Sequence, residues 1–347
     1  PDLQRLQPYP FEKLRQLFAD LSPPADKTSI ALSIGEPRHP APDFVLESLA
    51  NNLDKLSNYP LTQGLPTLRA AIAAWLTQRF QLEGVDPESQ VLPVTGTREA
   101  LFAFAQAAIT PGPDALVVCP NPFYQIYEGA TLLAGARPLF INCTEEHGFL
   151  PDFANVTAKQ WQQCQLVYLC SPGNPTGAVM PVERMQALIR LAIEHDFIIA
   201  ADECYSEIYF DEGQPPPGLL QACATMGNND FHNCVVFHSL SKRSNLPGLR
   251  SGFVAGDADI LAKFLLYRTY HGCAMPPHHQ LASIEAWNDN AHVVANRQRY
   301  RDKFKAVLEV LDGHLEVAMP EAGFYLWPKT PVAETTFARE LYAGEHI

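Results

Sequence analysis

The chain has 347 residues, of which 47 % are apolar and 18 % are charged, and its formal net charge at pH 7 is −13. The apolar fraction excludes a disordered chain, and the length suggests about two domains. The acidic balance gives no electrostatic basis for binding nucleic acid or an anionic membrane. No apolar run approaches the roughly 18 residues of a membrane span, and the first residues carry no apolar signal segment, so we expect a cytoplasmic protein.

Eight cysteines and eleven histidines are the candidate metal ligands and disulfide formers. Most of the cysteines lie inside apolar runs and none is spaced as Cys-x-x-Cys, which favours buried, reduced thiols. The adjacent pair His278-His279 has no cysteine or carboxylate partner at ligand spacing. We therefore expect no metal site.

Short apolar runs closed by turn residues predict seven strands, at 91–94, 115–119, 137–141, 166–170, 197–201, 235–237 and 252–255. Helical patterns lie between them, at 99–109, 125–134 and 182–195. This alternation predicts an α/β domain with a mostly parallel sheet. The runs are continuous, as expected when helices cover both faces of the sheet.

We place the large domain at 42–275. A long helical pattern follows at 280–311, and the tail carries a strand-like segment at 324–327 and a helical one at 336–343. We expect 1–41 and 276–347 to pack together as a smaller α+β domain.

Two candidate ligand-binding turns follow predicted strands, where α/β sheets place their chemistry. Gly96 and Thr97 stand at a strand-to-helix junction, whose free N–H groups could seat a phosphate. An ordinary helix cap is the alternative. Asn174 lies in a rigid loop with two prolines and two glycines, and could hydrogen-bond a ligand oxygen. A plain turn is the alternative.

Two charged groups follow later strands. Asp202 comes directly after five apolar residues, so a buried carboxylate there needs a cationic partner, unless it only caps a helix. Lys242 stands in a turn of small residues after a buried strand, and Arg250 could supply a positive neighbour and a phosphate clamp. Such a lysine suits Schiff-base chemistry, and a basic surface turn is the alternative. Together, a phosphate seat, a carboxylate in need of a cation and a nucleophilic lysine match pyridoxal phosphate.

From about Ile34 onward the chain resembles the fold-type I pyridoxal-phosphate aminotransferases of class I/II. The resemblance rests on Ser-Pro-Gly-Asn-Pro-Thr-Gly at 171–177, on Asp202-x-x-Tyr205, and on Ser239-x-x-Lys242 followed by Arg250. It implies a large domain with a mostly parallel seven-stranded sheet and helices on both faces. It also implies pyridoxal 5′-phosphate as the cofactor and a homodimer with shared active sites.

The resemblance assigns the catalysis to Lys242, Asp202 and Tyr205. Lys242 binds the cofactor covalently and moves the substrate proton, Asp202 pairs with the ring nitrogen, and Tyr205 and Asn174 hydrogen-bond the ring hydroxyl oxygen. Further implied cofactor contacts are the stacking aromatic Tyr124, the partner-reaching Tyr59, and the phosphate ligands Gly96, Thr97, Arg98, Ser239 and Arg250.

The segment Gly-Glu-Pro-Arg-His-Pro at 35–40 resembles the proteobacterial N-succinyldiaminopimelate aminotransferases. This implies transfer of an amino group from glutamate to N-succinyl-2-amino-6-ketopimelate in lysine biosynthesis. Gly35, Asn174 and Arg38 would contact the substrate, although Arg38 also reads as an exposed loop arginine. The family binds the substrate α-carboxylate with an arginine near its C-terminus, and none matches here, so we expect further residues beyond Ile347.

Other readings remain open on sequence alone. An aspartate, alanine or aromatic aminotransferase, or a β-lyase of the same fold, would share every cofactor residue. In a different class, Ser239-x-x-Lys242 also fits the Ser-x-x-Lys of penicillin-binding acyl-enzymes. The companion Ser-Asp-Asn and Lys-Thr-Gly motifs are absent, because Lys329-Thr330 is followed by Pro331.

Overall fold

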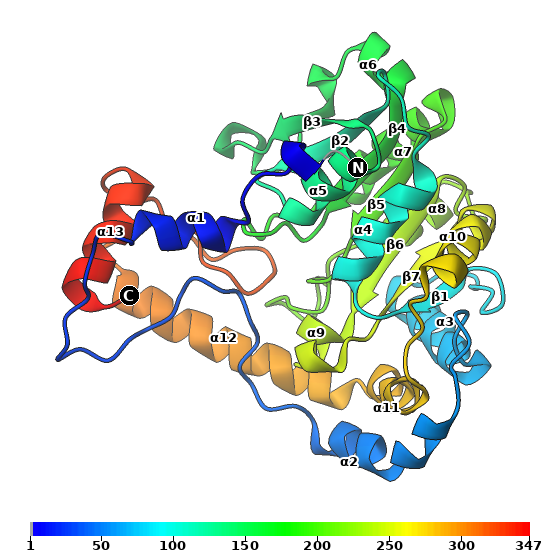
Figure 1. Ribbon diagram of the computed structural model, residues 1–347, viewed down its shortest axis with the longest axis horizontal. Helices are drawn as coiled ribbons and strands as arrows, with labels where there is room; N and C mark the ends of the chain where they lie inside the picture. Colours follow the sequence, from blue (N-terminus) through cyan, green and yellow to red (C-terminus); the bar gives the residue numbers. More distant parts are fainter. Residues whose placement is uncertain (1–2) are drawn as a thin grey trace.

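A computed structural model describes residues 3–347 and centres on one seven-stranded sheet (Figure 1). The strand order is β1-β7-β6-β5-β4-β2-β3. Only β7 runs against its neighbours, β1 and β6, and the other pairs are parallel. The prediction of a mostly parallel seven-stranded sheet is confirmed. The strands are β1 (Val91–Val94), β2 (Leu116–Asn121), β3 (Arg137–Asn142), β4 (Cys164–Cys170), β5 (Ile198–Asp202), β6 (Cys234–Ser239) and β7 (Gly252–Gly256).

Helices cover both faces of this sheet, and further helices extend from it (Figure 1). Within residues 3–347, no helix is long and apolar enough to cross a membrane. The helices are α1 (Pro10–Leu17), α2 (Asp43–Asn51), α3 (Pro66–Phe80), α4 (Thr97–Ala108), α5 (Gln125–Leu133), α6 (Ala158–Gln163), α7 (Val182–His195), α8 (Leu219–Thr225), α9 (Leu240–Arg243), α10 (Ala258–His271), α11 (Pro277–Asn288), α12 (Ala291–Leu311) and α13 (Glu334–Glu345).

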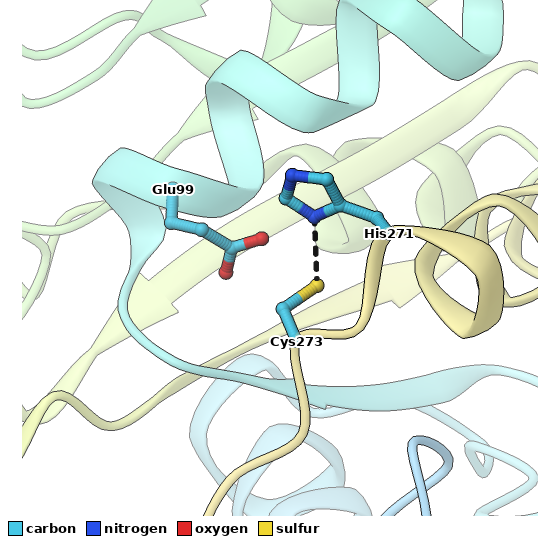
Figure 2. A group of neighbouring side chains, drawn as sticks. All are labelled: Glu99, His271 and Cys273. Atoms are coloured by element: carbon cyan, nitrogen blue, oxygen red, sulfur yellow. Dashed lines mark hydrogen bonds between the residues drawn. The ribbon is translucent and has the colours of Figure 1, made fainter.

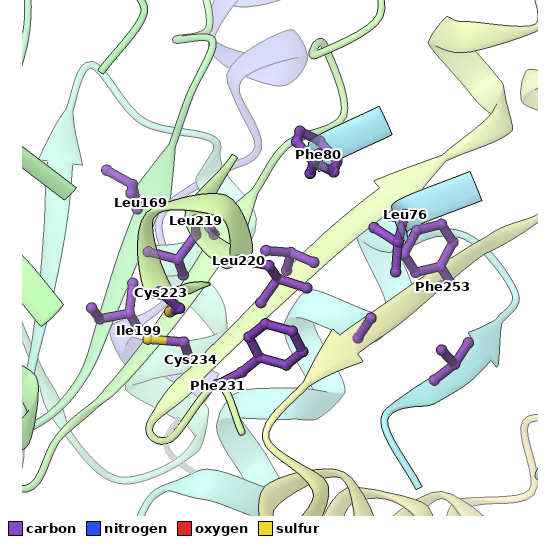
Figure 3. Close-up of a cluster of buried hydrophobic side chains, with 14 of the residues drawn as sticks. Leu76, Phe80, Leu169, Ile199, Leu219, Leu220, Cys223, Phe231, Cys234 and Phe253 are labelled. Atoms are coloured by element: carbon purple, nitrogen blue, oxygen red, sulfur yellow. The ribbon is translucent and has the colours of Figure 1, made fainter. Parts of the chain in front are cut away.

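Two apolar cores lie on opposite faces of the sheet because successive strand residues point to opposite sides. On β4, Val167 packs in the core with α3, α7 and α8, whereas Tyr168 packs in the core with α4, α5 and α10. Figure 3 shows part of the first core, where Phe80 and Leu220 approach the sheet. Burial on both sides explains why the central strands read as continuous apolar runs.

One predicted helix is wrong, because the pattern at 280–311 forms two helices, α11 and α12. The break falls at Asp289 and Asn290. The Asp289 carboxylate accepts a hydrogen bond from the His292 N–H at 2.9 Å, and its carbonyl accepts one from Arg243 at 3.2 Å. The first bond satisfies an N–H in the first turn of α12, and the second, from Arg243 of α9, holds the Asp289 carbonyl where α11 ends.

The strand-like segment at 324–327 forms no strand, and only isolated bridges flank it, at Ala322 and Lys329. Phe324 packs instead against a small cluster that contains Ile208, Tyr300 and Phe304. The apolar residues at 324–327 therefore belong to a partly buried loop and not to a strand.

The two ends of the chain pack together, with α1 beside α13 (Figure 1). Phe18 stacks on Tyr342 with ring centroids 4.6 Å apart, and Asp20 pairs with Arg339 at 2.7 Å. Residues near the two ends of the chain are therefore in contact. The α11 residue Trp287 lies in the core of the α3 face. The division into domains at 42–275 stays a prediction.

Candidate active site

A cavity of about 1030 Å³ lies at the carboxyl ends of β1, β2, β4, β5 and β6. It is the position where open α/β sheets bind ligands. Most of the residues predicted from sequence line it: Gly35, Thr97, Arg98, Tyr124, Asn174, Asp202, Tyr205, Ser239, Lys242 and Arg250.

Lys242 occupies the short helix α9 at the end of β6. The Ser239 hydroxyl caps this helix by accepting the Ser241 N–H at 3.0 Å. The Lys242 Nζ donates to the Gly35 carbonyl at 3.1 Å and lies 4.9 Å from the centre of the Phe324 ring. Burial lowers the pKa of Lys242 below its usual 10.5. The amine is thus held in the cavity and loses its proton more easily than a free lysine.

Asp202 ends β5 and is only 5 % exposed. The Tyr127 hydroxyl donates to its Oδ2 at 2.8 Å, and the Cys204 N–H donates to its Oδ1 at 3.3 Å. Burial raises the pKa of Asp202, and no cation of residues 3–347 forms an ion pair with it. A buried carboxylate without an ion-pair partner is stabilised when a cationic group of a ligand binds beside it.

An anion cradle forms where β1 runs into α4. Gly96 has φ +97°, and a Cβ at this position would lie 2.3 Å from a guanidinium nitrogen of Arg250. Only glycine allows this close approach. Arg250 itself has φ 54° and donates to the Pro247 carbonyl at 2.9 Å, which fixes its side chain. The N-terminus of α4 adds unpaired N–H groups and the positive end of the helix dipole.

Aromatic hydroxyls lie on another wall of the cavity. The Tyr205 hydroxyl lies 3.4 Å from that of Tyr325, and Tyr325 also packs directly against Gly35. Because Tyr325 comes from the segment at 324–327, the tail of the chain helps to close the site. The sequence prediction missed this residue, and its only signal was the aromatic run around it.

The N-terminal segment contributes Tyr9 and Lys13 to the cavity. Arg98 donates to the Tyr9 hydroxyl at 2.8 Å and lies 5.3 Å from the centre of its ring. Neither Lys13 nor Arg98 forms an ion pair with a carboxylate among the described residues. Two side-chain cations therefore face this end of the cavity without a carboxylate in ion-pair contact, although Glu128 also lines the cavity.

Two predicted residues lie away from the cavity. Arg38 is exposed and does not line it, and Tyr59 is fully exposed at the surface. His39, next to Arg38, turns inward and contacts Asn296 at 2.8 Å. The structure of the single chain thus gives Arg38 no ligand contact, whereas Tyr59 is free to reach a second molecule.

The Ser-x-x-Lys reading receives no geometric support. The Ser239 hydroxyl donates its one proton either to the Ser241 hydroxyl or to the Ser251 carbonyl, while the Lys242 amine is hydrogen-bonded to Gly35. A serine nucleophile requires a hydrogen bond to its base. Ser239 serves here as a helix cap.

A separate group of ligand-type side chains lies beside the start of α4: Glu99, His271 and Cys273 (Figure 2). His271 Nδ1 lies 3.1 Å from the Cys273 sulfur. The Glu99 carboxylate pairs with Arg268 at 2.6 Å and accepts the Thr95 hydroxyl at 2.8 Å. Both carboxylate oxygens of Glu99 thus have partners, and its bond to Thr95 stabilises the turn that carries Gly96.

Comparison with known proteins agrees with this site. The family model for aminotransferases of class I and II matches residues 27–347. The LL-diaminopimelate aminotransferase of Maridesulfovibrio salexigens is 32 % identical over 338 residues, which is 96 % of this chain and 85 % of that protein.

Two solved structures are similar over almost the whole chain. An aminotransferase from Neisseria meningitidis superposes with a TM-score of 0.95 at 47 % identity, covering 99 % of this chain and 87 % of that one. A probable N-succinyldiaminopimelate aminotransferase from Thermus thermophilus superposes with a TM-score of 0.84 at 26 % identity, covering 96 % and 87 %. The chain belongs to the class I and II aminotransferases.

Proposed function

We propose that this aminotransferase uses pyridoxal 5′-phosphate and exchanges an amino group between glutamate and N-succinyl-2-amino-6-ketopimelate. The observation that carries the cofactor is the buried Asp202 carboxylate, which faces the cavity with two hydrogen-bond donors and no ion-pair partner among residues 3–347. When bound, the cofactor supplies an aldehyde for the substrate amine and a ring that accepts electron density.

The donor set fits this cofactor group by group. Asp202 would pair with the protonated ring nitrogen, and Tyr205 and Asn174 would hydrogen-bond the ring oxygen. Tyr124 would stack on the ring. The phosphate would bind at the start of α4, where Gly96 gives room for the Arg250 guanidinium, with Thr97, Ser239 and the backbone N–H of Arg98 as further ligands.

Lys242 would carry both the covalent attachment and the proton transfer. Its Nζ lies beside Gly35 in the wall of the cavity, and burial lowers its pKa. In its neutral form the amine would be able to condense with a carbonyl group, with release of water, and when not so attached the same Nζ would be placed to take a proton from the substrate Cα. Phe324, from the tail of the chain, lies over this amine and limits its contact with water.

The charge of the cavity supports the succinylated substrate. LL-diaminopimelate carries two ammonium and two carboxylate groups, whereas its N-succinyl derivative carries one ammonium and three carboxylates. Lys13 and Arg98 offer two side-chain cations that form no ion pair with a carboxylate among the described residues. The additional carboxylate of the succinylated substrate can pair with them, which favours its binding over that of LL-diaminopimelate. The similarity to a probable N-succinyldiaminopimelate aminotransferase points the same way.

LL-diaminopimelate itself is the second candidate, because a relative at 32 % identity has LL-diaminopimelate aminotransferase as its name. Both candidates share the cofactor site and differ only in the group at the far end of the substrate.

A substrate panel separates the two. The purified protein with pyridoxal phosphate and 2-oxoglutarate should convert N-succinyl-LL-diaminopimelate with a kcat/KM at least about 10-fold above that of LL-diaminopimelate, aspartate or alanine. Formation of glutamate is measured. Arg98→Gln and Lys13→Gln should lower this preference. Equal or better use of LL-diaminopimelate would replace the succinylated substrate by the second candidate, and equal or better use of aspartate would overturn both.

We also propose a homodimer with shared sites. Tyr59 is fully exposed and is flanked by the exposed Leu56 and Leu61. An apolar surface of this kind favours a second copy of the chain, and Tyr59 would then reach the phosphate in the partner's cavity.

A further inference from the structure

We infer that Tyr127 is a positioning residue, which aims the Asp202 carboxylate at the cofactor ring and holds it in its charged form. This inference rests on the proposed cofactor and adds a residue to its site. The Tyr127 hydroxyl donates to Asp202 Oδ2 at 2.8 Å, and the Tyr127 side chain is completely buried.

The direction of this hydrogen bond is fixed by the surroundings. Burial and the nearby Asp202 charge raise the pKa of Tyr127 well above 10, so its hydroxyl stays protonated and donates. A donor to the charged form of a carboxylate favours that form. Tyr127 thereby offsets the burial that raises the pKa of Asp202.

Few other groups can do the same for Asp202. On its own segment, the Cys204 N–H donates at the longer distance of 3.3 Å. His238 of β6 and Lys242 of α9 act through space only, and the thiols of Cys170 and Cys204 and the phenols of Tyr124 and Tyr205 remain neutral because burial raises their pKa values. The Cys204 thiol also hydrogen-bonds the carboxylate and lowers the pKa of Asp202. Tyr127 is the donor at 2.8 Å, closer to Asp202 than the Cys204 N–H at 3.3 Å.

The position of Tyr127 makes it suited to this role. It lies in the first turn of α5, three residues after Tyr124, so one helix start delivers both the ring-stacking residue and the donor to Asp202. Its ring stacks on Tyr168 with centroids 4.5 Å apart and an angle of 12° between the planes. The Tyr168 hydroxyl is itself tied to the Leu101 carbonyl at 2.8 Å, so the donor cannot swing away from the carboxylate.

Tyr127→Phe tests the inference, and Tyr168→Phe is the matched control. Each removes one buried hydroxyl from the same stacked pair, but only the first removes a contact with Asp202. The readout is the ¹⁵N NMR signal of ring-labelled pyridoxal phosphate bound to the protein, followed between pH 6 and 9.

Tyr127→Phe should lower the apparent pKa of the ring nitrogen by about one unit or more and weaken cofactor binding about 10-fold. It should reduce kcat with little change in KM, because Tyr127 acts through Asp202. Tyr168→Phe should keep the wild-type ring signal.

A ring signal in Tyr127→Phe that matches the wild type over this pH range would overturn the inference and leave the proposed cofactor intact. Wild-type protein that does not bind pyridoxal phosphate would overturn both. Should the Phe variant fail to fold, 3-fluorotyrosine at position 127 keeps the shape and donates more strongly, and it should raise the ring-nitrogen pKa. An unchanged or lower value would then count against the inference.

Discussion

At the residue scale, Lys242 shows how burial prepares a nucleophile. Its amine lies under Phe324, close to Arg250, and burial is the main cause of its lowered pKa. Because the pKa is lowered, the neutral form appears at a lower pH than for free lysine, and the rate of covalent cofactor attachment should rise with pH with a midpoint below 10.5. Mixing cofactor-free protein with pyridoxal phosphate at different pH values, and following the absorbance, checks this. A midpoint at or above 10.5 would contradict it.

At the element scale, the start of α4 depends on one glycine. Gly96→Ala would place a Cβ 2.3 Å from Arg250 at a φ of +97°, so the variant should weaken phosphate binding and cost about 1–3 kcal/mol of stability. Gly248→Ala is the control, because nothing lies within 4 Å of a Cβ there. Cofactor titration and thermal unfolding of both variants measure the difference. Equal behaviour of the two would show that Gly96 is not needed for this cradle.

At the scale of the whole molecule, the exposed residues around Tyr59 should hold two chains together. We expect a dimer by light scattering. Leu61→Glu should lower the dimer fraction, whereas Val310→Glu on α12, where an apolar side chain is also exposed, should not. Tyr59→Phe should keep the dimer and weaken cofactor binding about 10-fold. A fully active monomer would contradict the shared site.

The sequence predicts the sheet well because its central strands are buried on both faces and read as unbroken apolar runs. It also points to Asp202, because a carboxylate directly after a buried strand is costly unless it is paired, and to Lys242, which stands in a turn of small residues after another buried strand. The break between α11 and α12 is not predictable in this way, because Arg243 helps to fix it from a distant part of the chain. The hydrogen bond between Tyr127 and Asp202 is not predictable either, because the two residues are 75 positions apart in the sequence. The exposure of Arg38 is likewise not predictable, because it depends on how its loop packs.

The most direct test of the account is to find which lysine holds the cofactor. The purified protein is loaded with pyridoxal phosphate, reduced with borohydride, digested and examined by mass spectrometry. We predict the reduced adduct on the peptide that contains Lys242 and its loss in Lys242→Ala, which should still bind the cofactor reversibly through Asp202 and Arg250. An adduct on a different lysine, or near-normal transamination by Lys242→Ala, would contradict the account.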